Sequence, residues 1–302
     1  MHAAAPPSKT APPPSGTGAL AAVIVANVAL AFGPWFVRLA DTGPVAAAFW
    51  RVTLAAPVLI ALALAGGARP RRLGPALWVT LGLAGVCFAA DLGSWHIGIL
   101  HTTLANATLF GNSATFIFPI YGFLVARAWP SRTQGWALAL ALAGAALLMG
   151  RSYQLDARNL SGDLFCLLAG VLYAVYFVLM ARARDVMGPM SSLAVSTVAC
   201  IAPLWLFALL LGEAIWPVDW GPLIGLALIS QLIGQGCMIY ALGKLSPLVI
   251  GLALLVQPVV AAAIGWLAYG ERLGLADLVG VVMVAVALVL IRGERRLAPE
   301  PG

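Results

Sequence analysis

Long apolar stretches run through almost the whole chain and constrain its fold more than any other feature. They are roughly 20 residues long, the length that a helix needs to cross a bilayer, and proline, glycine and charged residues separate them. Hydrophobic residues make up 62% of the sequence and charged residues only 9%, whereas about 25% are charged in a typical soluble domain. The sequence therefore predicts an all-α integral membrane protein with ten transmembrane helices, at about 18–38, 44–65, 75–97, 103–125, 133–150, 162–181, 189–211, 222–242, 247–269 and 275–291.

The lysine and arginine residues indicate how these helices are oriented. If the N-terminus is inside, the segments on the cytoplasmic side carry 12 of the 17 basic residues and the outer loops carry four, with Arg51 inside a span. This asymmetry follows the positive-inside rule, so we expect a multi-pass protein of the cell inner membrane with both termini in the cytoplasm. The net charge of +6 then reflects topology rather than a nucleic-acid partner. Residues 1–17 and 293–302 are expected to be cytoplasmic tails, the first one disordered.

The two halves of the chain resemble each other at an offset of 143 residues. The stretch "GLAGVCFAADLG" (82–93) aligns with "GLALISQLIGQG" (225–236), and the Asp-x-Gly-Pro after the first span recurs after the sixth with one residue inserted. Each half holds five expected spans, and an odd number gives the halves opposite orientations. Inverted repeats are typical of secondary transporters, whose substrate site lies near the midplane between the halves. We therefore expect a five-helix repeat at 18–151 and a second at 162–292, arranged around a central cavity.

Three stretches resemble a known family: "FWRVTLAAPVL" (49–59), "DLGSWHIGILHTTLANATLFGN" (91–112) and "YGERLGLADLVGVVMVAVALVLI" (269–291). They are similar to the EamA branch of the drug/metabolite transporter superfamily, and the resemblance covers residues 18–292. It implies a basket of ten helices and the export of small metabolites by alternating access. YddG-type exporters of aromatic and other neutral amino acids fit best. Efflux of organic cations or drugs, and transport of nucleotide-sugar or lipid-type metabolites, are the alternatives.

Two strong charges, Arg51 and Asp91, lie deep inside expected spans. They are seven and about six residues from the outer ends of the second and third spans, so both lie ~9–10 Å below the outer surface. Their counterparts in the second half are Ser196 and Gly234, so the half that lacks the base also lacks the acid. This predicts a charge pair that joins two helices. The alternative is that one or both face the cavity and bind a substrate's carboxylate or ammonium group.

Further polar and aromatic residues are candidates for lining the cavity. Trp95 lies one helical turn from Asp91, and an indole beside a carboxylate suits an ammonium group with an apolar body; an interfacial tryptophan is the alternative. Pro119 and Pro258, in the fourth and ninth spans, are hinge candidates or tolerated kinks. Uncharged polar side chains near mid-span either line the cavity or hydrogen-bond between helices: Asn27, Asn106, Asn112, Tyr173, Tyr176, Gln231, Gln235 and Gln257.

Motifs of other protein classes are missing from the sequence. It contains no phosphate-binding G-x-x-x-x-G-K-[ST] motif, no H-E-x-x-H motif and no G-x-S-x-G motif at a span end, and its four cysteines lie singly in apolar stretches. We therefore expect no catalytic residues, metal, cofactor or ATP; a channel or an intramembrane enzyme is a remote alternative. The expected partners are the lipid bilayer and a small-molecule substrate, and ten spans in one chain favour a monomer. Proton antiport and facilitated diffusion both stay open.

Overall fold

The computed structural model describes residues 16–67, 74–102, 104–127, 129–150, 157–269 and 274–297. Within these residues all regular structure is helical. The expected tails lie largely outside the described residues. The helices of the first half are α1 (Gly16–Ala31), α2 (Gly33–Leu39), α3 (Pro44–Ala65), α4 (Pro75–His101), α5 (Leu104–Gly111), α6 (Ala114–Ala126) and α7 (Arg132–Gly150). The second half contains α8 (Leu160–Arg184), α9 (Pro189–Leu210), α10 (Gly221–Gly225), η2 (Leu226–Gln235), α11 (Gly236–Leu242), α12 (Pro247–Leu254), α13 (Val256–Tyr269) and α14 (Leu275–Leu297).

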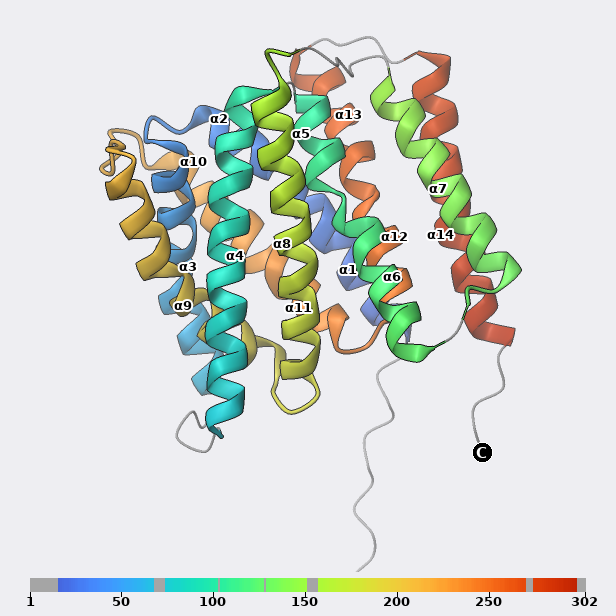
Figure 1. Ribbon diagram of the computed structural model, residues 1–302, viewed down its shortest axis with the longest axis horizontal. Coiled ribbons are helices and arrows are strands. Elements are labelled where there is room, and N and C mark those ends of the chain that lie inside the picture. The colour runs from blue at the N-terminus through green and yellow to red at the C-terminus, as the bar shows by residue number, and fades with distance from the viewer. Residues whose placement is uncertain are drawn as a thin grey trace, which may run out of the picture.

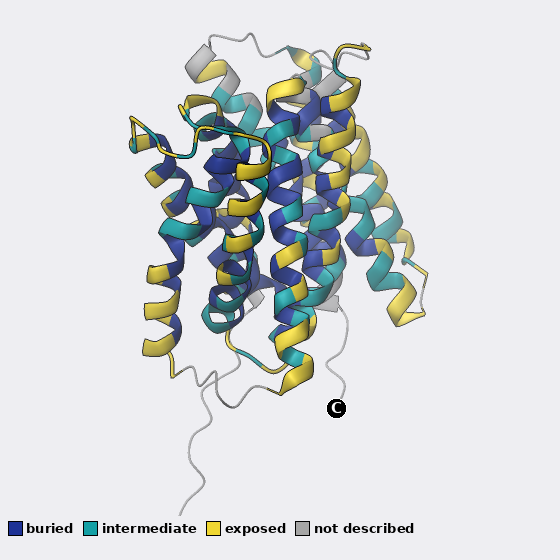
Figure 2. Ribbon diagram, turned by 60° about the vertical axis from the view of Figure 1, so that its left-hand side comes forward, coloured by how far each residue is buried: buried dark blue, intermediate teal, exposed yellow. Residues whose placement is uncertain are grey.

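Many of these helices are long and apolar enough to cross a bilayer. Figure 1 shows them as a bundle with broadly parallel axes, and Figure 2 shows that their buried faces turn toward its interior. Among the residues that the structure describes, six segments meet the length and apolarity of a span: Thr17–Leu39, Pro44–Ala65, Pro75–His101, Leu160–Arg184, Pro189–Leu210 and Gly221–Leu242. Shorter apolar helices cover Ala114–Ala126, Pro247–Ala261 and Leu278–Leu290. The structure is therefore that of an all-helical, multi-pass membrane protein, and the count of ten spans stays a prediction.

Two breaks in the helices lie at positions related by the same offset of 143 residues as the two halves. Asn112 and Ser113 separate α5 from α6, and Leu255 separates α12 from α13. Residues 112 and 255 are 143 positions apart, so the two halves break at equivalent points. Pro258 explains the second break, because a proline ring clashes with the carbonyl four residues earlier, here at the last residue of α12. Pro119 lies inside α6, beyond the first break, so the expected hinge of this half is displaced from its proline.

The helix between Gly221 and Leu242 contains an unusual wide segment. Its middle, η2, is a π-helix of ten residues that carries Gln231 and Gln235, both of them buried. π-Helical segments are rare and concentrate at functional sites, because the wider turn re-aims side chains. In this protein the widened turns bring two amides toward the centre of the bundle.

Small residues let the central helices approach closely. A Cβ added to Gly85 of α4 would collide with Ala199 of α9, and one added to Gly98 would collide with Cys166 of α8. Glycine is therefore required at both positions for this packing, which is typical of membrane helices. Helix α4 thus lies directly against α8 and α9, and it is the element that carries Asp91 and Trp95 into the bundle.

The connection between α9 and α10 (211–220) is fixed to the start of α3. The carboxylate of Glu213 accepts a hydrogen bond from the backbone N–H of Ala46 at 2.8 Å, in the first turn of α3. Asp41 in turn accepts one from the backbone N–H of Val218 at 2.8 Å. Carboxylates stabilise helix N-termini because the first N–H groups have no partner within the helix. These contacts fix the beginning of α3, the helix on which Arg51 lies.

Candidate substrate cavity

A cavity of about 70 Å³ opens between helices of both halves. This volume is smaller than that of typical small-molecule sites, which are roughly 300–1,000 Å³, so the cavity is narrow in this conformation. The cavity lies toward the end of the bundle at which α4 ends, since its walls include the last turn of α2, the second turn of α3 and the last turns of α4 (Figure 1). Its lining residues are Leu30, Ala31, Pro34, Trp35, Arg38, Arg51, Phe88, Asp91, Leu92, Trp95, Ala107, Thr108, Gly111, Asn112, Tyr173, Gln235, Gln257, Ala261 and Ile264.

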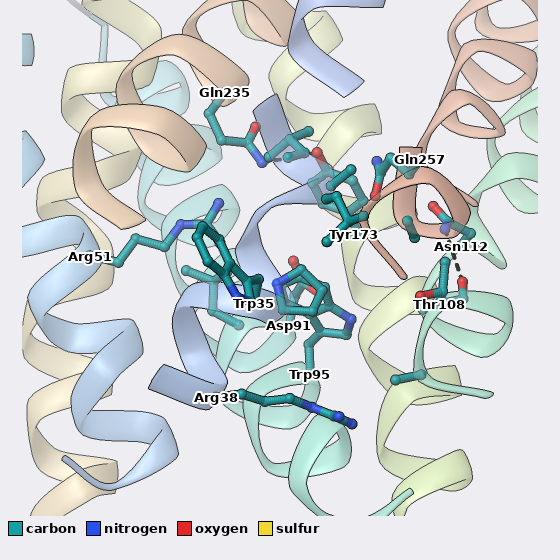
Figure 3. A pocket seen from close by; sticks show the side chains of 18 of the residues that line it. Trp35, Arg38, Arg51, Asp91, Trp95, Thr108, Asn112, Tyr173, Gln235 and Gln257 are labelled. Atoms are coloured by element: carbon teal, nitrogen blue, oxygen red, sulfur yellow. Dashed lines mark hydrogen bonds between the residues drawn. The ribbon is translucent and has the colours of Figure 1, made fainter. Parts of the chain in front are cut away.

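Asp91 projects from α4 into the middle of this cavity (Figure 3). The residue is only 7% exposed, and it is one of the residues that line the cavity. No described residue forms an ion pair with it within 4 Å. A carboxylate in a largely apolar enclosure is costly unless a cation or water approaches it, so Asp91 is placed to receive a positively charged group.

Arg51 reaches the same cavity from α3 but is held by the second half of the chain. Its Nε donates a hydrogen bond to Oε1 of Gln231 at 3.0 Å, and Nε2 of Gln231 donates to Oγ1 of Thr197 at 3.2 Å. The guanidinium carbon also lies 5.9 Å from the centre of the Phe88 ring. The predicted direct pair between Arg51 and Asp91 is therefore not formed in this structure, since η2 and an aromatic ring position the guanidinium instead.

Aromatic rings form a continuous wall beside the two charges. Phe88 stacks on Tyr176 with 4.5 Å between ring centres and on Tyr173 with 6.2 Å. The hydroxyl of Tyr173 accepts a hydrogen bond from Nε2 of Gln235 at 2.9 Å. Tyr173 and Gln235 line the cavity, whereas Tyr176 is fully buried behind Phe88. Tyr176 therefore supports the wall and does not contribute to its surface.

Besides Gln235, two of the predicted amides line the cavity directly, and another supports one of them. Nδ2 of Asn112 donates to the carbonyl of Thr108 at 2.9 Å, which satisfies the end of α5 (Figure 3). Nε2 of Gln257 donates to Oδ1 of Asn27 at 2.8 Å, and Nδ2 of Asn27 donates to the carbonyl of Val23. Asn112 and Gln257 lie at the cavity surface, while Asn27 is buried behind it.

Asn106 lies away from the cavity and has a different partner. Its Nδ2 donates to both carboxylate oxygens of Asp163 at 3.0 and 3.2 Å, and Oγ1 of Thr102 donates to the same carboxylate at 2.6 Å. Asp163 lies in the first turn of α8, so this cluster joins the start of α8 to the α4–α5 corner. The sequence interpretation did not include Asp163, although an isolated acid at the start of an apolar stretch was a visible signal.

Other residues of the wall were also missed from the sequence. Trp35 and Arg38 lie on α2, which follows a break at Phe32, and Arg38 donates to the carbonyl of Ile99 at 3.4 Å. Arg38 counts among the four basic residues expected on the outer side and was not expected in the cavity wall. The break turns α2 so that both side chains face the cavity.

Comparisons with known proteins agree with this architecture. Twenty-nine chains of solved structures match, and one of them, a protein crystal structure, is 18% identical, with a TM-score of 0.78 over 94% of this chain and 99% of that chain. At this identity the likeness shows the fold alone. A search of curated proteins found no match. The pattern of the EamA-like transporter family matches twice, at residues 17–150 and 160–293. The chain therefore belongs to the EamA-like transporter family, the members of which carry small molecules across membranes.

Proposed function

We propose that the protein exports amino acids, aromatic and other neutral ones, through the central cavity by alternating access. The observation that carries the proposal is that Arg51 and Asp91 face one cavity without pairing with each other. An amino acid presents a carboxylate and an ammonium group on neighbouring atoms. Opposite charges that stay separate in the empty cavity are complementary to such a zwitterion, and each is already desolvated by its surroundings.

The partner of each charge follows from its chemistry. The guanidinium of Arg51 presents paired N–H donors that suit a carboxylate, and its Nε is already held by Gln231. The carboxylate of Asp91 suits the ammonium group. Arg38 adds a second cation at the wall, which draws the carboxylate end of a substrate toward the cavity.

Aromatic residues would accommodate the substrate's side chain. Trp35, Phe88 and Trp95 line the cavity together with apolar residues of α1 and α13. Aromatic rings pack well against an indole or phenyl group, and they also tolerate smaller aliphatic side chains. A site of this kind favours aromatic and other neutral amino acids over acidic or basic ones. Once Arg51 and Asp91 bind the backbone groups of the substrate, Arg38 is the only charged lining residue left to pair with an ionised substrate side chain.

Alternating access rests on the two equivalent helix breaks. Away from Arg38, α6 and α12 pack tightly: a Cβ on Gly251 would lie 2.5 Å from Cγ of Pro119 and 2.6 Å from the carbonyl oxygen of Thr115. The cavity is thus closed at this end. Bending at Asn112–Ser113 and at Leu255 would open it here and close it at the other end, with Pro119 and Pro258 next to the moving segments.

The same proposal includes the placement of the chain in the membrane. We infer that the protein acts as a monomer in the cell inner membrane, with both termini in the cytoplasm and with inverted repeats at 18–151 and 162–292. The basic loops support this orientation. Fusing a reporter that is active only in the cytoplasm to each loop tests it, because the signal should alternate from loop to loop.

A counterflow assay in liposomes tests the substrate class. Purified protein is reconstituted with unlabelled amino acid inside, and the uptake of radiolabelled amino acids, organic cations and nucleotide sugars is measured outside. We expect tryptophan, phenylalanine and leucine to exchange, and lysine and tetraethylammonium to exchange poorly. Exchange of nucleotide sugars alone would replace this proposal, because the two arginines of the wall also suit an anionic metabolite. Repeating the assay with a pH gradient separates antiport, which accumulates substrate, from facilitated diffusion.

A further inference from the structure

We propose that Trp95 is a steric filter that limits the size of the substrate, and that Gly33 and Gly111 set its position. The inference rests on the proposed transport function, because it concerns the same cavity. It goes beyond that function in naming a residue that decides which side chains pass and two glycines that control it.

The indole of Trp95 lies between two glycines of different helices. A Cβ on Gly33 would lie 3.2 Å from Cη2 and 3.4 Å from Cζ3 of the ring. A Cβ on Gly111 would lie 2.9 Å from Nε1 and 3.1 Å from Cδ1. The six-membered ring therefore touches Gly33 and the five-membered ring touches Gly111. Distances below about 3.4 Å are tighter than ordinary carbon contacts, so an added methyl group must displace the ring.

Both glycines lie where a helix is interrupted. Gly33 is the first residue of α2, after the break at Phe32, and Gly111 is the last residue of α5, before the break at Asn112. The indole thus bridges the two interruptions from the neighbouring α4. The position of the ring depends on both breaks.

The ring is free to move in one direction only. On the side away from the cavity, Trp95 packs against an apolar cluster that includes Val37, Ile99 and Leu226. On the other side it lines the cavity, one helical turn from Asp91. Because the cluster is buried, a methyl group on Gly111 or Gly33 pushes the indole into the cavity, where it takes space from the substrate.

Trp95 also lies on the route into the site. Figure 3 shows Arg38 and Trp95 at one end of the cavity and Tyr173, Gln235 and Gln257 at the other. A substrate whose ammonium group is at Asp91 must place its side chain next to this ring. The filter therefore acts on the side chain and leaves the two charged groups of the substrate untouched.

The first test compares large and small amino acids in the counterflow assay. Gly111→Ala and Gly33→Ala should each lower the ratio of tryptophan to alanine exchange about tenfold, and Trp95→Ala should raise it. Two glycines of α4 serve as controls, since neither touches Trp95: a Cβ on Gly82 meets no atom within 4 Å, and one on Gly93 would lie 3.1 Å from Phe207. Their alanine variants should keep the wild-type ratio.

The double variant separates a filter from general damage. Gly33 does not line the cavity, so a methyl group added there acts through the indole, and Gly33→Ala should leave the ratio unchanged in a chain that already carries Trp95→Ala. An equal drop with and without the indole would overturn the proposal. So would an unchanged ratio in the single Gly111→Ala variant when that variant folds, as judged by its thermal unfolding.

A second measurement does not depend on the identity of the substrate. In a chain whose four native cysteines are replaced by alanine, Gln257→Cys is labelled by thiol reagents of increasing size. Labelling by the largest reagent should slow about tenfold in the presence of Gly111→Ala, while the smallest reagent keeps its rate. If no amino acid exchanges but labelling shows this dependence on size, the substrate class is wrong and the filter stands. If labelling is independent of reagent size in every variant, the filter is wrong.

Discussion

Nε of Arg51 donates a hydrogen bond to Oε1 of Gln231 at 3.0 Å, and this bond joins the first half of the chain to the second across the cavity wall. Gln231 is itself held by Thr197. The guanidinium is therefore oriented before any substrate arrives, which lowers the entropy lost on binding. Its remaining N–H donors stay available for a carboxylate.

Removing the acceptor should weaken substrate binding. Gln231→Leu leaves the Arg51 side chain without its partner, and we expect the apparent affinity for amino acids to fall about tenfold, or ~1.4 kcal/mol. The concentration dependence of counterflow measures this. Thr197→Val keeps the bond between Arg51 and Gln231, so it should change affinity less than about threefold. Wild-type affinity in Gln231→Leu would show that this bond does not position the guanidinium.

The cluster around Asp163 should contribute to stability and leave the substrate's affinity unchanged. Asp163→Ala removes the acceptor that Thr102 and Asn106 share, and we expect a loss of about 2 kcal/mol in the free energy of unfolding, since hydrogen bonds to charged groups are strong. Thermal or denaturant unfolding in detergent measures it. Ser161→Ala is the matched control, because Ser161 is exposed in the same turn of α8. A loss of affinity without a loss of stability would contradict this assignment.

The carboxylate of Asp41, in the loop between α2 and α3, should make the stability of the folded protein depend on pH. The backbone N–H groups of Asp219 and Val218 donate to it and hold its pKa below the ordinary value of 3.8. The ionised form is thus favoured in the folded protein, so the stabilisation is complete above 3.8 and is lost as the pH falls through the lower folded value. Unfolding temperatures of the wild type and Asp41→Asn should converge on acidification. A constant gap would show that the two hydrogen bonds contribute nothing.

Closure of the open end can be trapped by cross-linking. At the closed end, Gly251 lies close to Thr115. The offset of 143 residues relates Gly251 to Thr108 and Thr115 to Pro258, so closing the open end should bring Thr108 close to Pro258. Thr108 and Ala261 now line opposite walls of the open cavity, on α5 and α13. In a chain without native cysteines, Thr108→Cys with Ala261→Cys should therefore form a disulfide during turnover and stop transport. Reducing agent should restore transport, and the single variants should stay active. Full activity after oxidation would argue against closure by these helices.

Local signals in the sequence located the helices well. Pro44 and Pro189 are the first residues of α3 and α9, where the sequence placed the starts of two spans, because proline is well suited to the first helical turn. The expected first span runs through the break at Phe32, although Gly33 and Pro34 follow it directly and are a visible signal for it. The π-helix carrying Gln231 was also missed, because its wide turns depend on packing and not on composition.

The site was only partly predictable for a related reason. Depth along the helices placed Arg51 and Asp91 at one level, and both do reach one cavity. Which groups they touch depends on the rotation of each helix and on its neighbours across the bundle. Gln231 comes from the other half of the chain, and Asn106 turned to Asp163 instead of the cavity. Neither relationship is encoded in local spacing.

The central claim, that Arg51 and Asp91 bind opposite ends of one substrate, is tested most directly by inhibition of tryptophan counterflow. Tryptophan is compared with tryptamine, which lacks the carboxylate, and with indole-3-propionate, which lacks the ammonium group. In the wild type, tryptophan should inhibit at least about tenfold more strongly than either analogue. Asp91→Asn should abolish the preference over indole-3-propionate, and Arg51→Gln should abolish the preference over tryptamine. If both variants weaken all three compounds equally, the two charges support the fold and the account of the site is wrong.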